Sequence, residues 1–158
     1  MTDYASIADA IKATLQADAW LGNVANVTTI EAYGRDFQFQ GDDDAPFYDD
    51  AELPALSILP NVSPQDQQIE TVGEIRHLVQ AEVTVVSGAA GAAASARAHD
   101  AIVGNIERVL DAQKTSAADL GINALVRDVG TTTSRFKRSE KTYFISRINF
   151  IIDLTTTY

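Results

Sequence analysis

The sequence contains no cysteine, no long hydrophobic run and few positive charges, and each absence narrows what the chain can do. Without cysteine there are no disulfide bonds and no thiolate metal sites, which fits a reducing cytoplasm. No stretch approaches the roughly 18 consecutive apolar residues of a membrane-spanning helix. The first residues, MTDYASIADAIKATLQ, lack the basic start and apolar run of a secretory signal. We therefore expect no membrane partner and no export signal.

The charge balance is strongly acidic. Lys and Arg number 12 against 22 Asp and Glu, which gives a formal net charge of −10. Such a surface repels phosphates, so it disfavours general affinity for nucleic acid. The 158 residues are most simply one domain, 1–158, long enough to form a core without disulfides or metals.

Hydrophobic periodicity predicts two main helices and five strands. The clearest strand is 74–87, where apolar and polar residues alternate, and the last strand alternates similarly, with Asp153 on the face opposite Phe150. Hairpins dominate and a single helix crosses over. We therefore predict an α+β fold with a mostly antiparallel sheet, a long C-terminal β-hairpin and the two helices packed on the sheet. The predicted elements are a helix capped by Asp3 or Ser6, strands at 27–33, 55–60 and 74–87, a helix at 95–113, strands at 122–136 and 141–158, a long loop at 37–54 and a polar connection at 61–73.

The two histidines do not predict a metal or catalytic centre. A zinc site without cysteine would need both of them together with carboxylates. His77 lies on the apolar face of a predicted strand, which favours a satisfied core residue, and His99 is predicted to lie on the surface of the second helix. The predicted buried stripe of that helix comprises Ala98, Ile102, Ile106, Val109, Leu110 and Gln113.

Signatures of other chemistries are missing. The sequence has no GxxxxGK[ST], GxGxxG or GxSxG motif. Gly88 and Gly91 stand between a strand and a helix, as in a phosphate cradle, but their spacing matches neither fingerprint, and an alanine-rich helix start explains them. In the acidic loop Gly41 precedes the acids, unlike a calcium loop, so a solvated loop or partner surface is favoured. We predict no catalytic residue, no metal, no cofactor and no enzymatic activity.

Positive charge gathers in SRFKRSEK, residues 134–141, at the predicted turn of the last hairpin. Aromatics interleave there, as in a nucleic-acid reader, but one hairpin tip offers few phosphate contacts. A membrane surface would call for a cationic amphipathic helix. A solvated turn remains an alternative, whereas a basic tip and an acidic loop on one chain suit a head-to-tail contact that closes a ring. The predicted interface residues are Arg135, Lys137, Arg138 and Lys141 in the tip and Asp42, Asp43, Asp44, Asp49, Asp50 and Glu52 in the loop.

The layout as a whole resembles a known family. The order runs from IADAIKATLQADAWLGNV to a strand ending in AYGRDF, a long polar loop, PALSILP, HLVQAEVTVVS, the helix AHDAIVGNIERVLDA and a β-rich hairpin. This order resembles the tail terminator, or tail completion, proteins of tailed bacteriophages over nearly the whole chain. The similarity lies in element order and pattern, and no single motif is diagnostic.

The resemblance implies a virion structural protein at the head–tail junction, assembled in the host cytoplasm. Such proteins are α+β subunits of a hexameric ring that caps the tail tube, ends its polymerisation and joins the head connector or neck proteins. DNA passes through the lumen, where carboxylates would repel its phosphates. The basic residues would contact a neighbouring subunit or the tail tube protein. The long acidic loop, 41–52, departs from the family pattern.

Two alternatives remain open at this point. The first is another head–tail junction component, a neck or head-completion protein of the same build. The second is a small cytoplasmic enzyme or ligand-binding domain, which would need a deep pocket around His77 or His99.

Overall fold

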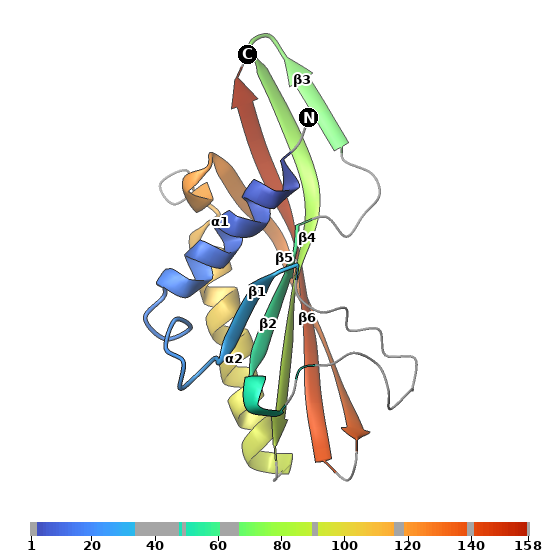
Figure 1. Ribbon diagram of the computed structural model, residues 1–158. Coiled ribbons are helices and arrows are strands. Elements are labelled where there is room, and N and C mark those ends of the chain that lie inside the picture. Colours follow the sequence, from blue (N-terminus) through green and yellow to red (C-terminus); the bar gives the residue numbers. More distant parts are fainter. Residues whose placement is uncertain are drawn as a thin grey trace.

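Two helices lie on one face of a six-stranded sheet (Figure 1). The structure is a computed structural model that describes residues 3–33, 48, 50–60, 67–89, 92–115, 119–138 and 141–157. The elements are α1 (Tyr4–Ala17), β1 (Thr29–Ala32), η1 (Asp50–Glu52), β2 (Ala55–Leu59), β3 (Gln67–Thr71), β4 (Glu74–Ala89), α2 (Ala92–Ala112), η2 (Asp119–Gly121), β5 (Ala124–Arg138) and β6 (Lys141–Thr157), where η marks a single-turn 3-10 helix.

The strand order is β1-β2-β4-β6-β5, and β3 pairs with the part of β4 that β2 leaves free. All pairs are antiparallel except β1 with β2, which is parallel. This arrangement confirms the predicted α+β fold with a mostly antiparallel sheet and a long C-terminal hairpin.

Three long strands, β4, β6 and β5, form the spine of the sheet. With 16 residues, β4 spans roughly 50 Å at the usual rise per residue. The central strand β6 pairs with β4 from Thr142 to Thr157 and with β5 from Lys141 to Leu154. The hairpin therefore has a third strand along nearly its full length, and its turn lies at one end of an elongated sheet.

The start of α1 is fixed by the first of its two predicted caps. The Asp3 carboxylate accepts hydrogen bonds from the Ser6 amide at 3.0 Å and from the Ser6 hydroxyl at 2.6 Å. These bonds hold the pKa of Asp3 below its ordinary value. The apolar stripe of α1 is buried against the sheet and comprises Ile7, Ala8, Ile11 and Leu15.

The main core lies between the two helices and the sheet. Strand β4 contributes Val79, Ala81, Val83 and Val85, the face predicted from its alternation. From α2 come four of the predicted stripe residues, Ile102, Ile106, Val109 and Leu110. Ala98, predicted to be buried with them, is exposed, because the helix is turned so that His99 faces the sheet instead.

The connection predicted at 61–73 contains a strand that the sequence pattern did not reveal. Strand β3 pairs with Glu74–Leu78 through the turn at Val72 and Gly73, where Gly73 has a φ of 83°. Its sequence, QQIET, has a single large apolar residue, so it lacks the alternation that marks a half-buried strand. Backbone pairing with its long neighbour β4 makes this segment a strand.

Two glycines, Gly22 just after α1 and Gly104 on α2, offer a matched test of how closely the backbone packs at each position. A Cβ at Gly22 would lie 2.2 Å from the Gln16 carbonyl oxygen, whereas a Cβ at Gly104, on the surface of α2, meets nothing within 4 Å. We expect Gly22→Ala to lower the free energy of unfolding by about 2 kcal/mol or more. Gly104→Ala should raise it by about 0.5–1 kcal/mol through helix propensity. Urea unfolding of both variants measures the two effects. Equal shifts of the same sign would contradict the close approach of Gly22 to the Gln16 carbonyl.

Candidate interaction surface

The sheet face turned away from the helices carries most of the polar strand residues. Because Val79, Ala81 and Val83 point toward the helices, the intervening side chains of β4 point to the opposite side. We call this side the outer face. Its described members on the central strands include Arg76, Leu78, Gln80, Glu82, Thr84 and Val86 of β4, Ile145, Arg147, Asn149, Ile151, Asp153 and Thr155 of β6, and Leu125, Arg127, Thr132 and Ser134 of β5.

At the end near the hairpin turn, the outer face holds a second small core. Tyr48, Ala55, Val86 and Ile145 are buried together, with Leu53 packed beside them. The Tyr48 hydroxyl donates a hydrogen bond of 2.8 Å to the Glu31 carboxylate on β1. Tyr48 and Leu53 belong to the stretch predicted as a long loop, so that stretch contributes side chains to the fold.

Toward the other end, the outer face carries an ion cluster around a buried carboxylate. Asp153 on β6 is only 3% exposed. The Arg76 guanidinium donates to it through Nε, 3.1 Å from Oδ1, and through Nη2 to Oδ2. The Nη2 atom of Arg127 lies 2.8 Å from the same Oδ2. Two cations from the flanking strands thus meet one anion, and the hydrogen bond and charge of Asp153 raise the pKa of Arg76 further above its usual value.

On the face of the sheet that the helices cover, a buried polar network joins α2 to the strands. It corrects the prediction for His99. The ring is completely buried, not on the surface. Its Nδ1 lies 2.6 Å from the Ser87 hydroxyl and its Nε2 lies 2.7 Å from the Ser146 hydroxyl, which in turn lies 2.7 Å from the Thr133 hydroxyl. Burial lowers the pKa of His99 to about 4, against a smaller opposing effect of Asp100.

The two serines beside a histidine suggest a nucleophile and a base, but the setting does not support that role. His99 and Ser146 are both 0% exposed, so a substrate cannot reach either without opening of the core. The residues bonded to the ring carry no carboxylate that would orient it as a base. His77, the other candidate centre of a pocket, is also buried, on β4. The network therefore acts within the described core as a structural link between α2, β4, β5 and β6.

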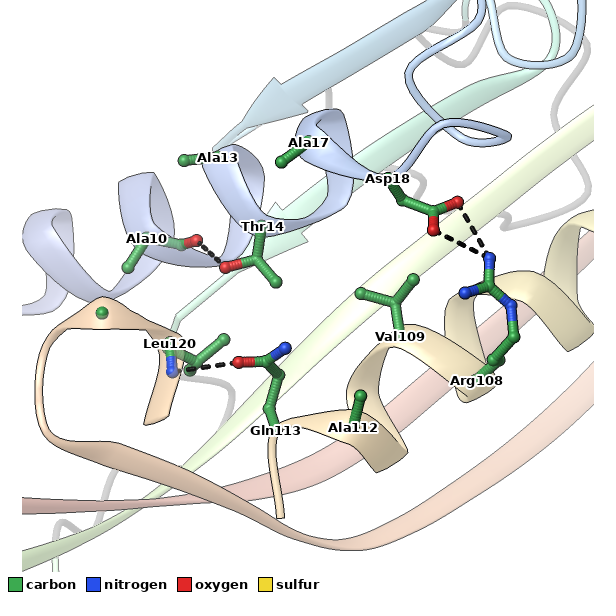
Figure 2. Close-up of a pocket in the computed structure, with 11 residues that line it drawn as sticks. Ala10, Ala13, Thr14, Ala17, Asp18, Arg108, Val109, Ala112, Gln113 and Leu120 are labelled. Carbon is green, nitrogen blue, oxygen red and sulfur yellow. Dashed lines mark hydrogen bonds and ion pairs between the residues drawn. The ribbon is translucent and has the colours of Figure 1, made fainter. Parts of the chain in front are cut away.

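A groove between α1 and α2 has a volume of about 550 Å³ (Figure 2). Its floor and walls are mostly small or apolar, with Ala10, Ala13, Ala17, Val109 and Ala112 among them. The polar atoms drawn at its rim are bonded to one another. Nη2 of Arg108 lies 2.9 Å from both carboxylate oxygens of Asp18, and the Leu120 amide donates to the Gln113 side chain at 3.1 Å. The Thr14 hydroxyl, also in the lining, donates to the Ala10 carbonyl at 2.8 Å.

The predicted basic tip lies where the sheet ends. Arg135 is exposed on β5, and the backbone of Lys137, Arg138 and Lys141 forms the last pairs of the hairpin, with Arg138 opposite Lys141. The side chains of these last three lie outside the described residues. Of the predicted acidic loop, Asp42, Asp43, Asp44 and Asp49 also lie outside them, while Asp50 and Glu52 bound η1, just before β2.

The described part of the chain shows no grouping of metal ligands and no membrane-spanning helix. Within 3–33, 48, 50–60, 67–89, 92–115, 119–138 and 141–157, no three His, Asp or Glu side chains group as metal ligands would. No helix in this part of the chain combines the length and the hydropathy needed to span a bilayer.

Comparisons with known proteins find one distant structural likeness and no family. No protein-family model matches the sequence, and no curated protein matches it. Among solved structures, a chain of the "Virion of native gene transfer agent (GTA) particle" is similar, with 15% sequence identity and a TM-score of 0.49. The match covers 97% of this chain and 99% of that chain. A likeness of this degree does not assign a function.

Proposed function

We propose that the chain is a structural, non-enzymatic subunit of a phage-like virion, and more narrowly a tail terminator. In that role, copies form a ring, inferred to be hexameric from the family resemblance, that caps the tail tube, ends its polymerisation and joins the head connector. The element order that carried the family resemblance is retained in the fold, with a helix, a mixed sheet, a crossover helix and a closing hairpin.

One observation carries the proposal. A chain with a formal net charge of −10 places Arg135, Lys137, Arg138 and Lys141 at the closed end of its longest hairpin. A merely soluble surface gains nothing from concentrating its few cations at one end. A contact with an acidic partner gains attraction, orientation and a faster encounter.

The edges of the sheet suit a head-to-tail ring. Strand β5 is one edge, whereas β1 and β3 lie at the other side of β4. The pairing directions make β5 run opposite to β1, so the β5 edge of one copy meets the β1 edge of the next in an antiparallel sense. A repeated contact between two different surfaces closes into a ring when the rotation allows it. The acidic excess then leaves a lumen that repels DNA phosphates.

Charge reversal at the tip tests the proposal. We expect the variant with Arg135, Lys137, Arg138 and Lys141 all changed to Glu to lose ring formation and capping of open-ended tail tubes, because like charges replace the attractive contact. Negative-stain electron microscopy of the protein with and without such tubes provides the measurement.

A smaller pair of variants supplies the control. Arg135→Glu with Lys137→Glu changes the net charge by as much as Arg97→Glu with Lys114→Glu, two exposed positions on or near α2. The first pair should impair capping and the second should not. If the fourfold variant still forms rings that cap tubes, the tip is not the contact. If the wild-type chain binds filled heads but not tails, the protein is instead a neck or head-completion component.

A further inference from the structure

Two guanidiniums, from β4 and β5, meet at the Asp153 carboxylate. A single arginine with two hydrogen bonds neutralises a buried carboxylate, and Arg76 already supplies that arrangement. Arg127 adds a second guanidinium to the same oxygen. The exposed carboxylate of Glu74 on β4 also acts on Arg76 and helps to raise its pKa. The second guanidinium is nevertheless not needed to pair Asp153.

The two guanidiniums still have donors to offer. Each has five N–H groups, and the contacts with Asp153 use Nε and Nη2 of Arg76 and Nη2 of Arg127. The side chains of Arg76 and Arg127 are 35% and 51% exposed. Both side chains are thus partly open to solvent, while the buried carboxylate holds both forks in place.

The backbone beside Arg127 is shaped in an unusual way. The pairing of β5 with β6 shifts register between Arg127 and Gly130, which is a β-bulge. Asp128, the next residue, has a φ of 53°, a left-handed conformation that costs a non-glycine residue free energy. Bulges bend an edge strand and redirect a side chain. Here the bulge immediately follows the residue that reaches diagonally across β6 toward Asp153.

The surroundings match the anatomy of a binding hot spot. Asp153 is directly opposite Leu78 on β4 and Leu125 on β5, and Ile151 stands between Gln80 and Arg127 in the next row. These three apolar side chains are partly buried. Arginines framed by apolar side chains that exclude water are the kind of site that dominates the energetics of protein interfaces.

We propose that Arg76 and Arg127, held over Asp153, form a receptor for a carboxylate of a second copy of this chain. The planar forks match the two oxygens of a carboxylate. Each copy carries ten more acidic than basic residues, so neighbours in an assembly bring carboxylates in excess. Two arginines set among the carboxylates of Asp153 and Glu74 are too weakly positive to hold a DNA backbone against the charge of the whole chain. This inference rests on the proposed self-assembly and names a second contact within it, separate from the basic tip.

The test uses three substitutions of exposed arginines in the full chain. Arg127→Gln should weaken self-association, measured by sedimentation velocity over a concentration series, by about tenfold or more. Arg127→Lys keeps the charge but not the fork, so it should fall between Arg127→Gln and the wild type. Arg97→Gln, an exposed arginine on α2, should associate like the wild type. The melting temperature of Arg127→Gln should change by no more than about 3 °C, because Arg76 still pairs with Asp153.

Several results would overturn the inference. One is wild-type association of Arg127→Gln, and another is a wild-type chain that stays monomeric at its highest soluble concentration. If Arg127→Gln abolishes binding to a short DNA duplex that the wild type binds, the ligand is a phosphate instead. Tube capping separates this inference from the proposed function. Equal capping by wild type and Arg127→Gln would refute the receptor alone, while a wild type that caps nothing would refute the tail terminator.

Discussion

Changing His99 to alanine is expected to lower the free energy of unfolding by about 4 kcal/mol. Two losses add up in this estimate. The imidazole leaves a cavity in a fully buried site, and the Ser87 and Ser146 hydroxyls each lose the partner that now lies within 2.7 Å. For a chain of this size such a loss lowers the melting temperature by about 10 °C. Urea and thermal unfolding of the variant at neutral pH provide the measurement.

Companion variants separate the two losses. His99→Phe fills the space but removes the ring partner of both hydroxyls and leaves Ser146 bonded to Thr133, so it should cost less than His99→Ala. Adding Ser87→Ala and Ser146→Ala to His99→Phe removes the hydroxyls that lost their imidazole partner. The triple variant should recover part of the lost free energy of unfolding. Arg97→Ala, exposed on the same helix, should change stability by less than about 0.5 kcal/mol. A His99→Ala variant as stable as Arg97→Ala would show that the network contributes nothing.

The long strands β4 and β6 were predictable because each alternates along its length. Strand β4 shows its buried face through Val79, Val83 and Val85, and β6 does so through Ile148 and Ile152. A strand that pairs without such alternation could not be predicted in the same way. Nothing in QQIET indicates β3, because its backbone pairs with β4 while its sequence has a single large apolar residue and no alternation.

The phase of α2 was predicted almost correctly, and the error is informative. A stripe drawn through Ala98 instead of His99 fits hydropathy, since alanine is apolar and histidine is polar. The sheet offers hydroxyls at Ser87 and Ser146, which make a buried imidazole favourable. Hydroxyls that come from strands remote in sequence cannot be placed beside a helix before the fold is known. That is why a surface position was predicted for a core residue.

The same limit applies to the cluster on the outer face. The sequence places Asp153 on the face of β6 opposite the main core, and a lone acid in FIIDL signals that something must compensate it. Its partners are Arg76, which is 77 residues away, and Arg127 on the other neighbouring strand. Only the register of β4 and β5 with β6 brings the three together. Sequence reasoning found the basic tip because its residues are neighbours in the chain, and missed this cluster because they are not.

Acid is expected to weaken the wild-type fold by about 3 kcal/mol as the pH falls from 6.5 to about 4. The folded pKa of His99, about 4, lies below the ordinary value of 6.5, so the unfolded chain takes up the proton first. The stabilisation is therefore complete above pH 6.5, declines through this window and does not fall further below pH 4 on account of His99. Urea unfolding midpoints at a series of pH values measure the change.

The His99→Phe variant decides whether this window belongs to the buried imidazole. It should be less stable than the wild type at pH 7, yet its stability should change less between pH 6.5 and 4, because the group whose pKa is lowered by burial is gone. The carboxylates of Asp3 and Asp18 cannot produce the same signal. The bonds from Ser6 lower the pKa of Asp3. Burial opposes the shift of Asp18, but the Leu21 amide and the Arg108 guanidinium lower its pKa below the ordinary value, so both contributions are lost only at more acidic pH. If wild type and His99→Phe lose stability in parallel through the window, His99 is not the titrating group. If only the wild type does, the imidazole is neutral in the folded chain, because burial away from water disfavours the charged ring.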